Sequence, residues 1–392
     1  MSTSRRTFLQ QSLSASAAVW IGGETTGVGS ATADAAGSRL ITRGKSPYNA
    51  GAPLDELVQK WITPADLLFV RSHAATPKID AKTFRLSVEG LVEKPLRLSP
   101  ADLKRFDATS TVATLTCAGN RRYEHSRMKR IDGVQWREGA IGNARWQGVR
   151  LSAVLKAAGI KPGARHVWFE GRDEIDRKGK TIPFGGSIPI EKALGDSKSM
   201  PGAIVCTGMN GRPLPPDHGY PLRMVVPGYI GARSVKWLGR IVVSNRPSPN
   251  HYLANAYKVV TRGDKLELAE AGPIYAYPLN SVICTPKPGA GVKAPRVRVT
   301  GYALAQGRPG RTVKTVELST DGRRWHRAKL TSPVREYCWA LWSADLPVTA
   351  MTQQLIVRCT DSAGNTQPRK VAWNKKGYLY NAWHRVPVRV AD

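Results

Sequence analysis

The spacing of apolar and polar positions divides the chain into two parts with different predicted structure. In the first part, Phe84–Gly90 alternates apolar and polar side chains as a half-buried strand does. Met224–Pro227 and Ile241–Val243 are short apolar runs typical of buried strands. Leu151–Ala158 has the spacing of a short helix, and Gly159 follows it, as glycine commonly follows helices. Because strands and helices lack a regular βαβ order, the pattern predicts an α+β domain.

Two further segments of the first part carry helix signals. Leu54–Trp61 is predicted as a short helix, and the apolar segment Leu67–Val70 follows shortly after it. Ser99 is predicted to cap a helix that runs to Phe106, because Asp102 stands three residues after the serine, as in a capping box. Both signals fit short helices between the strands of the α+β domain.

After about residue 270 the pattern contains only strands and turns. Asp321-Gly322 is a hairpin signal, and short strands at this spacing predict an all-β immunoglobulin-like sandwich. Glycine and proline accumulate near residues 263–278, so we place the two domains at residues 36–268 and 269–392. The predicted strands are Arg296–Tyr302, Val313–Ser319, Trp325–Leu330, Cys338–Trp342 and Leu355–Thr360.

Residues 1–35 are predicted to be an export signal. Ser4–Gln10 contains a twin-arginine pattern, Leu13–Gly23 is weakly apolar, and Ala33–Ala35 fits a small-residue cleavage site. A basic amphipathic helix of a cytosolic protein is the alternative, and the Gly- and Thr-rich sequence after the apolar stretch favours export. The expected location is the periplasm. Since twin-arginine export moves folded proteins, it also suggests a cofactor loaded before export.

The net charge of +30 indicates an anionic partner. Residues 1–35 hold two arginines and two acidic residues, so their removal leaves this charge unchanged. Lysine and arginine are scattered and no nucleic-acid-binding module is recognisable, which argues against nucleic acid. Small anions, an anionic cofactor or an acidic redox protein remain. No internal apolar run reaches the roughly 18–20 residues that a membrane span requires.

The five cysteines indicate a free thiol. An odd number in an oxidising compartment leaves at least one cysteine unpaired within the chain. No pair has CxxC spacing, which argues against zinc and iron–sulfur sites, and no CxxCH motif for a c-type haem occurs. The cysteines are Cys117, Cys206, Cys284, Cys338 and Cys359.

One of these thiols follows a predicted strand directly. Thr111–Thr116 leads to Cys117, a small-residue turn follows, and Arg121 and Arg122 come after the turn. Guanidinium groups within a few ångströms would favour the thiolate, which is a nucleophile or a ligand for a soft metal. A buried and inert cysteine at the end of a strand is the alternative.

A second stretch interleaves basic side chains with glycine. Asp217–Arg223 and Pro227–Trp237 combine histidine, arginine and lysine with glycines at which backbone amides can approach a ligand closely. This composition suits a phosphate or another polar anion. A solvated basic face is the alternative, but the flanking apolar strands argue against it.

Four motifs, taken in order, resemble the sulfite oxidase family of molybdenum enzymes. The similarity runs from about Pro64 to Val390 and includes the C-terminal sandwich, which serves for dimerisation in that family. It implies an α+β molybdopterin domain followed by an immunoglobulin-like domain, as in a bacterial periplasmic sulfite dehydrogenase. The motifs are Cys117–Arg122, Asp217–Pro221, Gly231–Trp237 and Asn381–Val386.

The resemblance also implies roles for individual residues. Cys117 matches the protein ligand to molybdenum, whose coordination a pterin dithiolene and oxo groups complete. The positions that match pterin-binding residues are Phe69, Arg71, His73, Asp173, His218, Arg223, Ser234 and Lys236. The positions that match the substrate pocket are Arg71, Arg122, Trp136, Tyr257 and Arg385.

These residue types suit an oxyanion such as sulfite. Guanidinium groups are planar, multidentate donors that stay charged, Tyr257 can donate a hydrogen bond, and Trp136 can wall the pocket. One position departs from the family, which often has a lysine four residues before the tryptophan, where this chain has Asp132. An inward-pointing acid would weaken sulfite binding, whereas an ion pair with Arg130 or Lys129 would not.

Sulfite oxidation is therefore the expected activity, with several alternatives. The sandwich argues against the protein methionine-sulfoxide reductase branch, and Arg385 argues against nitrate reductase. A periplasmic protein that only binds anions is a further alternative, and the free thiol argues against it because binding alone needs no thiolate. The chain shows no haem domain, so we expect electrons to pass to a separate acceptor, such as a c-type cytochrome. A homodimer is expected, and a heterodimer with a cytochrome subunit is the alternative.

Overall fold

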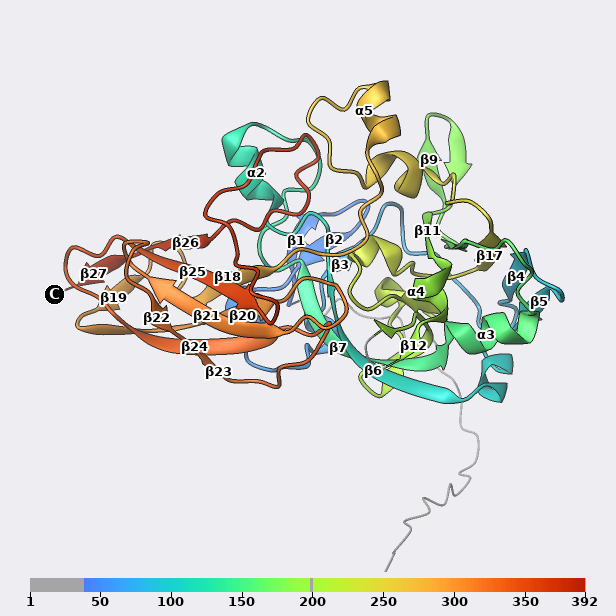
Figure 1. Ribbon diagram of the computed structural model, residues 1–392, viewed down its shortest axis with the longest axis horizontal. Coiled ribbons are helices and arrows are strands. Elements are labelled where there is room, and N and C mark those ends of the chain that lie inside the picture. The colour runs from blue at the N-terminus through green and yellow to red at the C-terminus, as the bar shows by residue number, and fades with distance from the viewer. Residues whose placement is uncertain (1–38, 198–199, 392) are drawn as a thin grey trace, which may run out of the picture. The chain divides into compact units, whose positions relative to one another are not determined.

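The computed structural model describes residues 39–197 and 200–391 of the chain, and the export signal predicted at residues 1–35 lies outside them. An α+β region extends to about residue 270, and an all-β region, drawn in orange and red, follows it (Figure 1). Both predicted architectures are confirmed. Among the described residues, no helix combines the length and apolar character that crossing a membrane requires.

Two five-stranded sheets make up most of the α+β region. The first has the order β15-β14-β7-β6 with β16 also paired to β14, and its neighbours are antiparallel. The second has the order β11-β8-β17-β4-β5, in which β17 and β4 run parallel. The first sheet comprises β6 (Ala108–Thr116), β7 (Ile141–Arg150), β14 (Ile204–Met209), β15 (Arg212–Pro213) and β16 (Arg223–Val225). The second comprises β4 (Leu86–Gly90), β5 (Leu96–Leu98), β8 (His166–Glu170), β11 (Gly185–Pro189) and β17 (Arg240–Ser244).

Small sheets and short helices surround these two sheets. The small sheets are formed by β1 (Ile41–Gly44), β2 (Asn49–Gly51) and β3 (Val70–Arg71), by β9 (Ile175–Arg177) and β10 (Lys180–Ile182), and by β12 (Asp196–Ser197) and β13 (Met200–Pro201). The α-helices are α1 (Leu54–Leu57), α2 (Arg122–Met128), α3 (Leu151–Ala158), α4 (Ile190–Leu194) and α5 (Lys265–Glu270). The 3₁₀ turns are η1 (Ala65–Leu67), η2 (Asp102–Arg105), η3 (Pro216–His218) and η4 (Gly231–Arg233), and η5 (Tyr252–Ala256) is a π-helical turn.

The local helix signals have a visible structural basis. Helix α3 ends at Gly159, whose φ of 68° lies in the left-handed region that glycine adopts without strain. The Ser99 hydroxyl accepts a hydrogen bond from the amide of Asp102, while the Asp102 carboxylate accepts one from the amide of Ser99. The predicted capping box is therefore present, although it begins a 3₁₀ turn. The helix predicted at residues 54–61 is shorter than expected and ends at Leu57.

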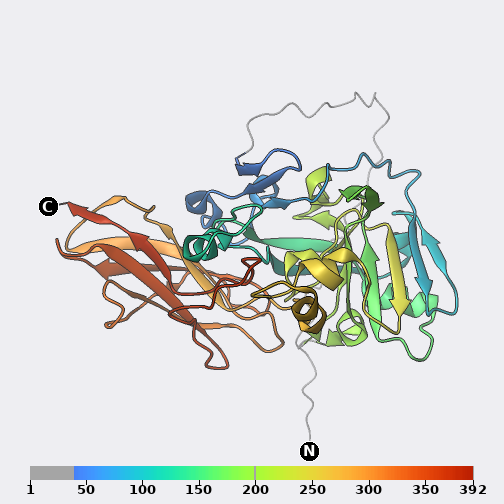
Figure 2. The same cartoon turned by 90° about the horizontal axis from the view of Figure 1, so that it is seen from above.

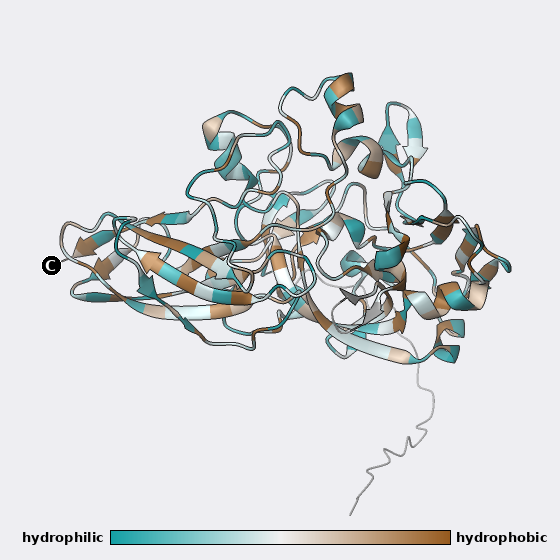
Figure 3. Cartoon of the chain, in the orientation of Figure 1, coloured by the Kyte–Doolittle hydropathy of each residue, from teal (hydrophilic) through white to brown (hydrophobic). Residues whose placement is uncertain are grey.

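The all-β region is a sandwich of two four-stranded sheets, with apolar residues along its strands (Figure 3). One sheet has the order β18-β20-β24-β23 and the other β22-β21-β25-β26, and β19 and β27 form a separate parallel pair. The expected strand at residues 325–330 divides into β22 and β23, which belong to different sheets. The strands are β18 (Asn280–Thr285), β19 (Gly291–Lys293), β20 (Arg296–Leu304), β21 (Val313–Ser319), β22 (His326–Arg327), β23 (Lys329–Leu330), β24 (Ala340–Pro347), β25 (Gln354–Asp361), β26 (His384–Pro387) and β27 (Arg389–Ala391).

The two regions meet at the C-terminal end of β6. The backbone amide of Thr114 on this strand donates to the carbonyl of Tyr337 at 2.8 Å, and its hydroxyl accepts from the amide of Trp339 at 2.8 Å. Apolar residues of both regions share one core, in which Ala118 packs in the same cluster as Tyr302. Helix α2 lies over this junction in both views (Figures 1 and 2). The segment that follows β6 is thus enclosed by both regions.

Candidate functional site

Cys117 occupies the first position after β6, and the backbone around it is fixed. Its amide donates to the carbonyl of Ala140 at 2.9 Å, and the amide of Gly119 donates to its sulfur at 3.4 Å. Nine paired positions between β6 and β7 precede this point, so the thiol stands at the end of a long antiparallel ladder. The ladder therefore determines where the sulfur lies.

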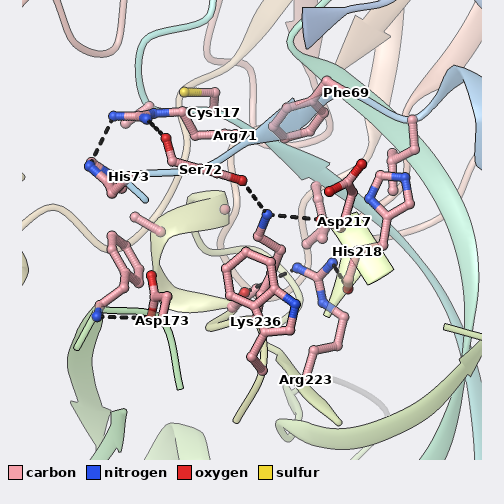
Figure 4. Close-up of a pocket in the computed structure, with 18 of the residues that line it drawn as sticks. Phe69, Arg71, Ser72, His73, Cys117, Asp173, Asp217, His218, Arg223 and Lys236 are labelled. Atoms are coloured by element: carbon pink, nitrogen blue, oxygen red, sulfur yellow. Dashed lines mark hydrogen bonds between the residues drawn. The ribbon is translucent and has the colours of Figure 1, made fainter. Parts of the chain in front are cut away.

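The Cys117 sulfur lies at the wall of a cavity in the α+β region (Figure 4). Every residue predicted from the sequence to bind a pterin contributes to the lining. These residues are Phe69, Arg71, His73, Cys117, Asp173, His218, Arg223, Ser234 and Lys236, and the predicted substrate residue Tyr257 also lines the cavity. The structure thus brings together side chains from segments that are far apart in the sequence.

Two cationic side chains form one end of the cavity and are held by neutral acceptors. The ammonium of Lys236 donates to the hydroxyl of Ser72 at 2.9 Å and to the carbonyl of Asp217 at 2.8 Å (Figure 4). The guanidinium of Arg223 donates to the carbonyls of His218 and Ser234, each at 3.0 Å. Both side chains thus donate hydrogen bonds to uncharged groups, and within the described residues no carboxylate cancels the positive charge that an anion would meet.

Burial strongly shifts the pKa values of these groups. It lowers the pKa of Lys236 to about 7 and that of Arg223 to about 10. It also lowers the pKa of His218 to about 3, helped by the charges of Lys236 and Arg223, so this imidazole is neutral at pH 7. Burial raises the pKa of Asp173, whose carboxylate accepts a hydrogen bond from the amide of Phe184 at 3.0 Å. A bound anion would offset the burial cost of the two cations.

The glycine of the Asp-His-Gly motif has a structural role here. Gly219 has a φ of 107°, a left-handed conformation that disfavours other residues. A Cβ atom at this position would lie 2.9 Å from the Cβ of Arg223 and 3.2 Å from the Cβ of Lys236. The glycine therefore permits the close packing of the two cationic side chains.

A hydrogen-bonded chain connects Arg71, His73 and Tyr257 beside the thiol. The Arg71 guanidinium lies 3.2 Å from Nδ1 of His73, and Nε2 of His73 lies 3.0 Å from the hydroxyl of Tyr257. Arg71 also donates to the side-chain oxygen of Asn49 at 3.1 Å. Burial, with the charges of Arg71 and Lys236, holds the pKa of His73 well below its usual value. Burial raises the pKa of Tyr257, so its hydroxyl remains protonated.

Arg122 and Trp136 lie just behind the cavity wall. The Arg122 guanidinium stacks over the ring of Tyr378 at 5.0 Å, and this ring stacks on Tyr257 at 5.2 Å. Trp136 is 1% exposed and its ring contacts Phe69 edge-on at 6.4 Å. The Nε atom of Arg122 is buried without a hydrogen-bond partner among the described residues. Both residues therefore belong to the shell of the site without lining the cavity itself.

Arg121 and Arg385 do not lie where the sequence predicted, beside the thiol and in the substrate pocket. Arg121 is fully buried and pairs with Glu124 and Asn280, so its charge is neutralised away from the thiol. Arg385 is exposed on β26 and donates to the side chain of Gln354 at 3.3 Å. Side chains alternate between the two faces of a strand, and His384 occupies the buried face. The structure does not bring Arg385 to the cavity.

Some residues of the site escaped the sequence analysis. Ser72, Phe184, Asp217 and Trp237 also line the cavity, and the ring of Tyr378 reaches Tyr257 from the C-terminal region. Asp217 and Trp237 lie within motifs that the sequence indicated, but Ser72, Phe184 and Tyr378 stand in segments without a distinctive pattern. Asp132, the departure from the family pattern, is exposed and makes no ion pair with Lys129 or Arg130 in the described part of the chain.

The pKa of Lys236 predicts a pH-dependent stability in the cofactor-free protein. Between pH 7 and 10.5 this lysine is protonated when unfolded and neutral when folded, so folding releases a proton. Burial of this lysine therefore lowers the free energy of unfolding most at pH 7 and below, and this destabilising contribution shrinks as pH rises toward 10.5. The slope for one proton cannot exceed about 1.4 kcal/mol per pH unit.

Replacing Lys236→Met should remove this contribution. Urea unfolding of both proteins at several pH values would measure it, with Lys329→Met, an exposed lysine on β23, as the matched control. We expect the stability gained by Lys236→Met to be largest near pH 7 and to shrink as pH rises. An equal difference at every pH would contradict the assignment.

Comparison with known proteins agrees with this geometry. A family model described as "Oxidoreductase molybdopterin binding domain" matches residues 73–252, and one described as "Mo-co oxidoreductase dimerisation domain" matches residues 271–391. The chain is 40% identical to a sulfite oxidase of Gallus gallus over 361 residues, covering 88% of this chain and 77% of that protein. It is 39% identical to a mitochondrial sulfite oxidase of Drosophila melanogaster over 367 residues, covering 88% of this chain and 62% of that protein.

A solved structure shares both regions of the fold. The sulfane dehydrogenase SoxCD from Paracoccus pantotrophus superposes with a TM-score of 0.74 at 26% sequence identity, covering 90% of this chain and 89% of that chain. The matched sequences and the matched fold extend over the α+β region and the sandwich alike. This chain therefore belongs to the sulfite oxidase family of molybdopterin-binding oxidoreductases.

Proposed function

We propose that this protein oxidises sulfite to sulfate at a molybdenum–pterin cofactor held by Cys117, and that it passes the electrons to a separate acceptor. The observation that carries the proposal is the position of one thiol at the wall of a cavity lined by buried cations, with Arg71 and Tyr257 beside it. The sulfite oxidases among the relatives support sulfite as the substrate.

The chemistry of the cavity fits such a cofactor. A thiolate is a preferred ligand for a soft metal, and Cys117 is the thiol of the described residues that faces this cavity. Arg223 and Lys236 are buried cations with neutral hydrogen-bond partners, and they would bind the phosphate of a pterin. Because unpaired buried charges are costly, an anionic cofactor would stabilise this part of the protein.

When bound, the molybdenum–pterin cofactor supplies the two-electron redox change that sulfite oxidation requires. The protein itself binds and orients the anion. Arg71 is held by Asn49 and His73 with its guanidinium at the cavity, and Arg122 stands behind Tyr378 with a buried Nε that lacks a partner in the described ranges. Fixed guanidinium charges would stabilise sulfite and sulfate at any working pH.

The hydrogen bonds of His73 determine which atom of Tyr257 faces the reaction. A guanidinium can only donate, so Nδ1 of His73 accepts from Arg71 and its proton resides on Nε2. This Nε2–H group then donates to the Tyr257 oxygen. The Tyr257 hydroxyl hydrogen is therefore free to donate to an oxygen of the substrate, as electrostatic stabilisation of the reacting oxyanion requires.

Two alternatives differ from sulfite oxidation in testable ways. The contrast with nitrate reductase rested on Arg385, which the structure places away from the cavity, so this residue no longer discriminates between the two substrates. The sandwich, absent from the methionine-sulfoxide reductase branch, still argues against a sulfoxide. A protein that only binds anions would contain no molybdenum.

Replacing Cys117→Ser should abolish sulfite oxidation. Purified wild-type protein is expected to contain about one molybdenum per chain and to reduce ferricyanide with sulfite. The variant should lose more than about a hundredfold in this activity, because a hydroxyl is a poor replacement for a thiolate ligand.

Cys338→Ser is the matched control for this experiment. This thiol is also buried, and it donates to the carbonyl of Val112 outside the cavity, where a hydroxyl can donate too. It should keep both metal and activity. Wild-type protein without molybdenum, after expression with intact cofactor synthesis, would refute the proposal. Metal-loaded protein active on nitrate but not sulfite would favour the alternative substrate.

The proposed acceptor is an acidic c-type cytochrome. Arg177, Lys375 and Lys376 define a basic rim. Burial, followed by the charges of Arg177, Lys258 and Lys375, lowers the pKa of Lys376. Figure 1 places β9, α5 and the dark red loop before β26 along one side of the molecule. The same loop carries Tyr378, which contacts Tyr257, so this basic rim adjoins the cavity. An acidic partner would be attracted to it.

Reduction of an acidic cytochrome should therefore depend on salt. We expect its rate to fall by about tenfold when ionic strength rises from about 20 mM to about 200 mM. Lys375→Glu should lower the rate at low salt, whereas Lys293→Glu on β19 makes the same charge change on the sandwich and serves as control. A rate that does not respond to salt would contradict electrostatic docking at this rim.

We also propose that the protein functions in the periplasm as a homodimer. The match to a dimerisation domain supports the dimer, and the twin-arginine pattern supports export. Replacing both Arg5→Lys and Arg6→Lys keeps the charge but removes the arginine pair. In a bacterium with twin-arginine export, this variant should accumulate in the cytoplasm, as measured by cell fractionation. Unchanged export would contradict the signal assignment.

A further inference from the structure

The loop that carries Cys117 is hydrogen-bonded to the sandwich. Tyr302, fully buried on β20, donates its hydroxyl hydrogen to the carbonyl of Glu138 at 2.8 Å. The same hydroxyl oxygen accepts from the side-chain amide of Asn120 at 3.1 Å, although the two residues are separated by 182 positions. A residue of the second region thus reaches into the loop that follows the thiol.

From Asn120 the chain of hydrogen bonds continues to Cys117. The side-chain oxygen of Asn120 accepts from the amide of Ala140 at 3.1 Å. The carbonyl of Ala140 accepts from the amide of Cys117 at 2.9 Å, and the carbonyl of Cys117 accepts from the amide of Asn120 at 2.9 Å. The thiol-bearing residue is therefore held on both its backbone groups by residues that Tyr302 fixes.

The direction of each bond in this chain is determined. A carbonyl cannot donate, so the Tyr302 hydrogen points to Glu138 and its oxygen must accept from Asn120. This orients the amide of Asn120 with its oxygen toward the Ala140 amide. Removing the hydroxyl would leave a buried donor on Asn120 and a buried acceptor on Glu138 without this partner, a larger penalty than the loss of an average hydrogen bond.

We infer that Tyr302 is a positioning residue for the Cys117 thiol, acting through Asn120 and Ala140. The inference concerns the thiol itself, and only its second test rests on the proposed function. It gives the sandwich a role beyond dimerisation, because one of its buried side chains maintains the geometry of the cavity wall. The small enclosed space between the loop and the sandwich is lined by both Tyr302 and Tyr277.

Tyr277 offers a matched control. It is 1% exposed, it lines the same space, and its hydroxyl is buried without a hydrogen-bond partner among the described residues. Tyr277→Phe and Tyr302→Phe therefore remove the same atom from the same environment. Only the second substitution removes hydrogen bonds, so the difference between the two variants reports on the link to Asn120.

The first test uses cofactor-free protein and does not depend on activity. The rate of Cys117 alkylation by iodoacetamide, followed by peptide mass spectrometry, measures how well the loop protects the thiol. Tyr302→Phe should increase this rate by about fivefold or more, while Tyr277→Phe leaves it at the wild-type value. Equal rates in Tyr302→Phe and wild type would overturn the inference, whatever the outcome for sulfite oxidation.

A second variant tests whether Tyr302 acts on Cys117 through Asn120. Asn120→Ala interrupts the same chain, so Tyr302→Phe combined with Asn120→Ala should alkylate no faster than Asn120→Ala alone. In metal-loaded protein, Tyr302→Phe should lower kcat by about tenfold with little change in the KM for sulfite, and alter the visible absorption of the metal–thiolate bond. If the effects of the two substitutions on the alkylation rate multiply in the double variant, or if the visible spectrum is unaltered, Tyr302 acts only on overall stability.

Discussion

The site depends on cations that are buried before any anion binds. Arg223 and Lys236 lose their hydration in the cavity, and burial lowers the pKa of each. Neutral carbonyl and hydroxyl groups satisfy their hydrogen bonds without cancelling the charge. Such an arrangement is stable only inside a rigid frame, because a flexible one would admit water or expel the charges. The two sheets and the sandwich provide that frame, and an anionic ligand completes it.

The same frame sets the position of the thiol. The β6–β7 ladder brings Cys117 to the cavity, and contacts from the sandwich restrain the loop that follows. Thr114 on β6 donates its amide hydrogen to the carbonyl of Tyr337, and its hydroxyl accepts from the amide of Trp339. The two regions share an apolar core at this point, so packing of the sandwich and geometry of the site are physically coupled. The second region thus contributes to the geometry of the site.

Features that depend on residues close together in the sequence could be predicted, whereas contacts between distant segments could not. Cys117 and His218 stand in contiguous motifs whose resemblance to the family implies their roles, and the capping box at Ser99 is a local signal too. Arg385 stood in a matching motif, but the side on which a strand residue points depends on the register of β26, which its spacing does not specify. Tyr302 reaches Asn120 across 182 positions, and only tertiary packing creates that contact.

The side chains in this cavity differ in whether their charge is permanent, and this difference matters for the proposed chemistry. The proposed reaction converts sulfite to sulfate, and the site would hold both anions with protein charges that do not change. Arg71 supplies a permanent charge, while His73 is kept neutral by burial beside it and Tyr257 keeps its proton. Because His73 can then donate only from Nε2, the direction of the Tyr257 hydroxyl follows from the arginine two residues before the histidine. A permanent charge therefore orients a neutral donor in the cavity that Cys117 lines.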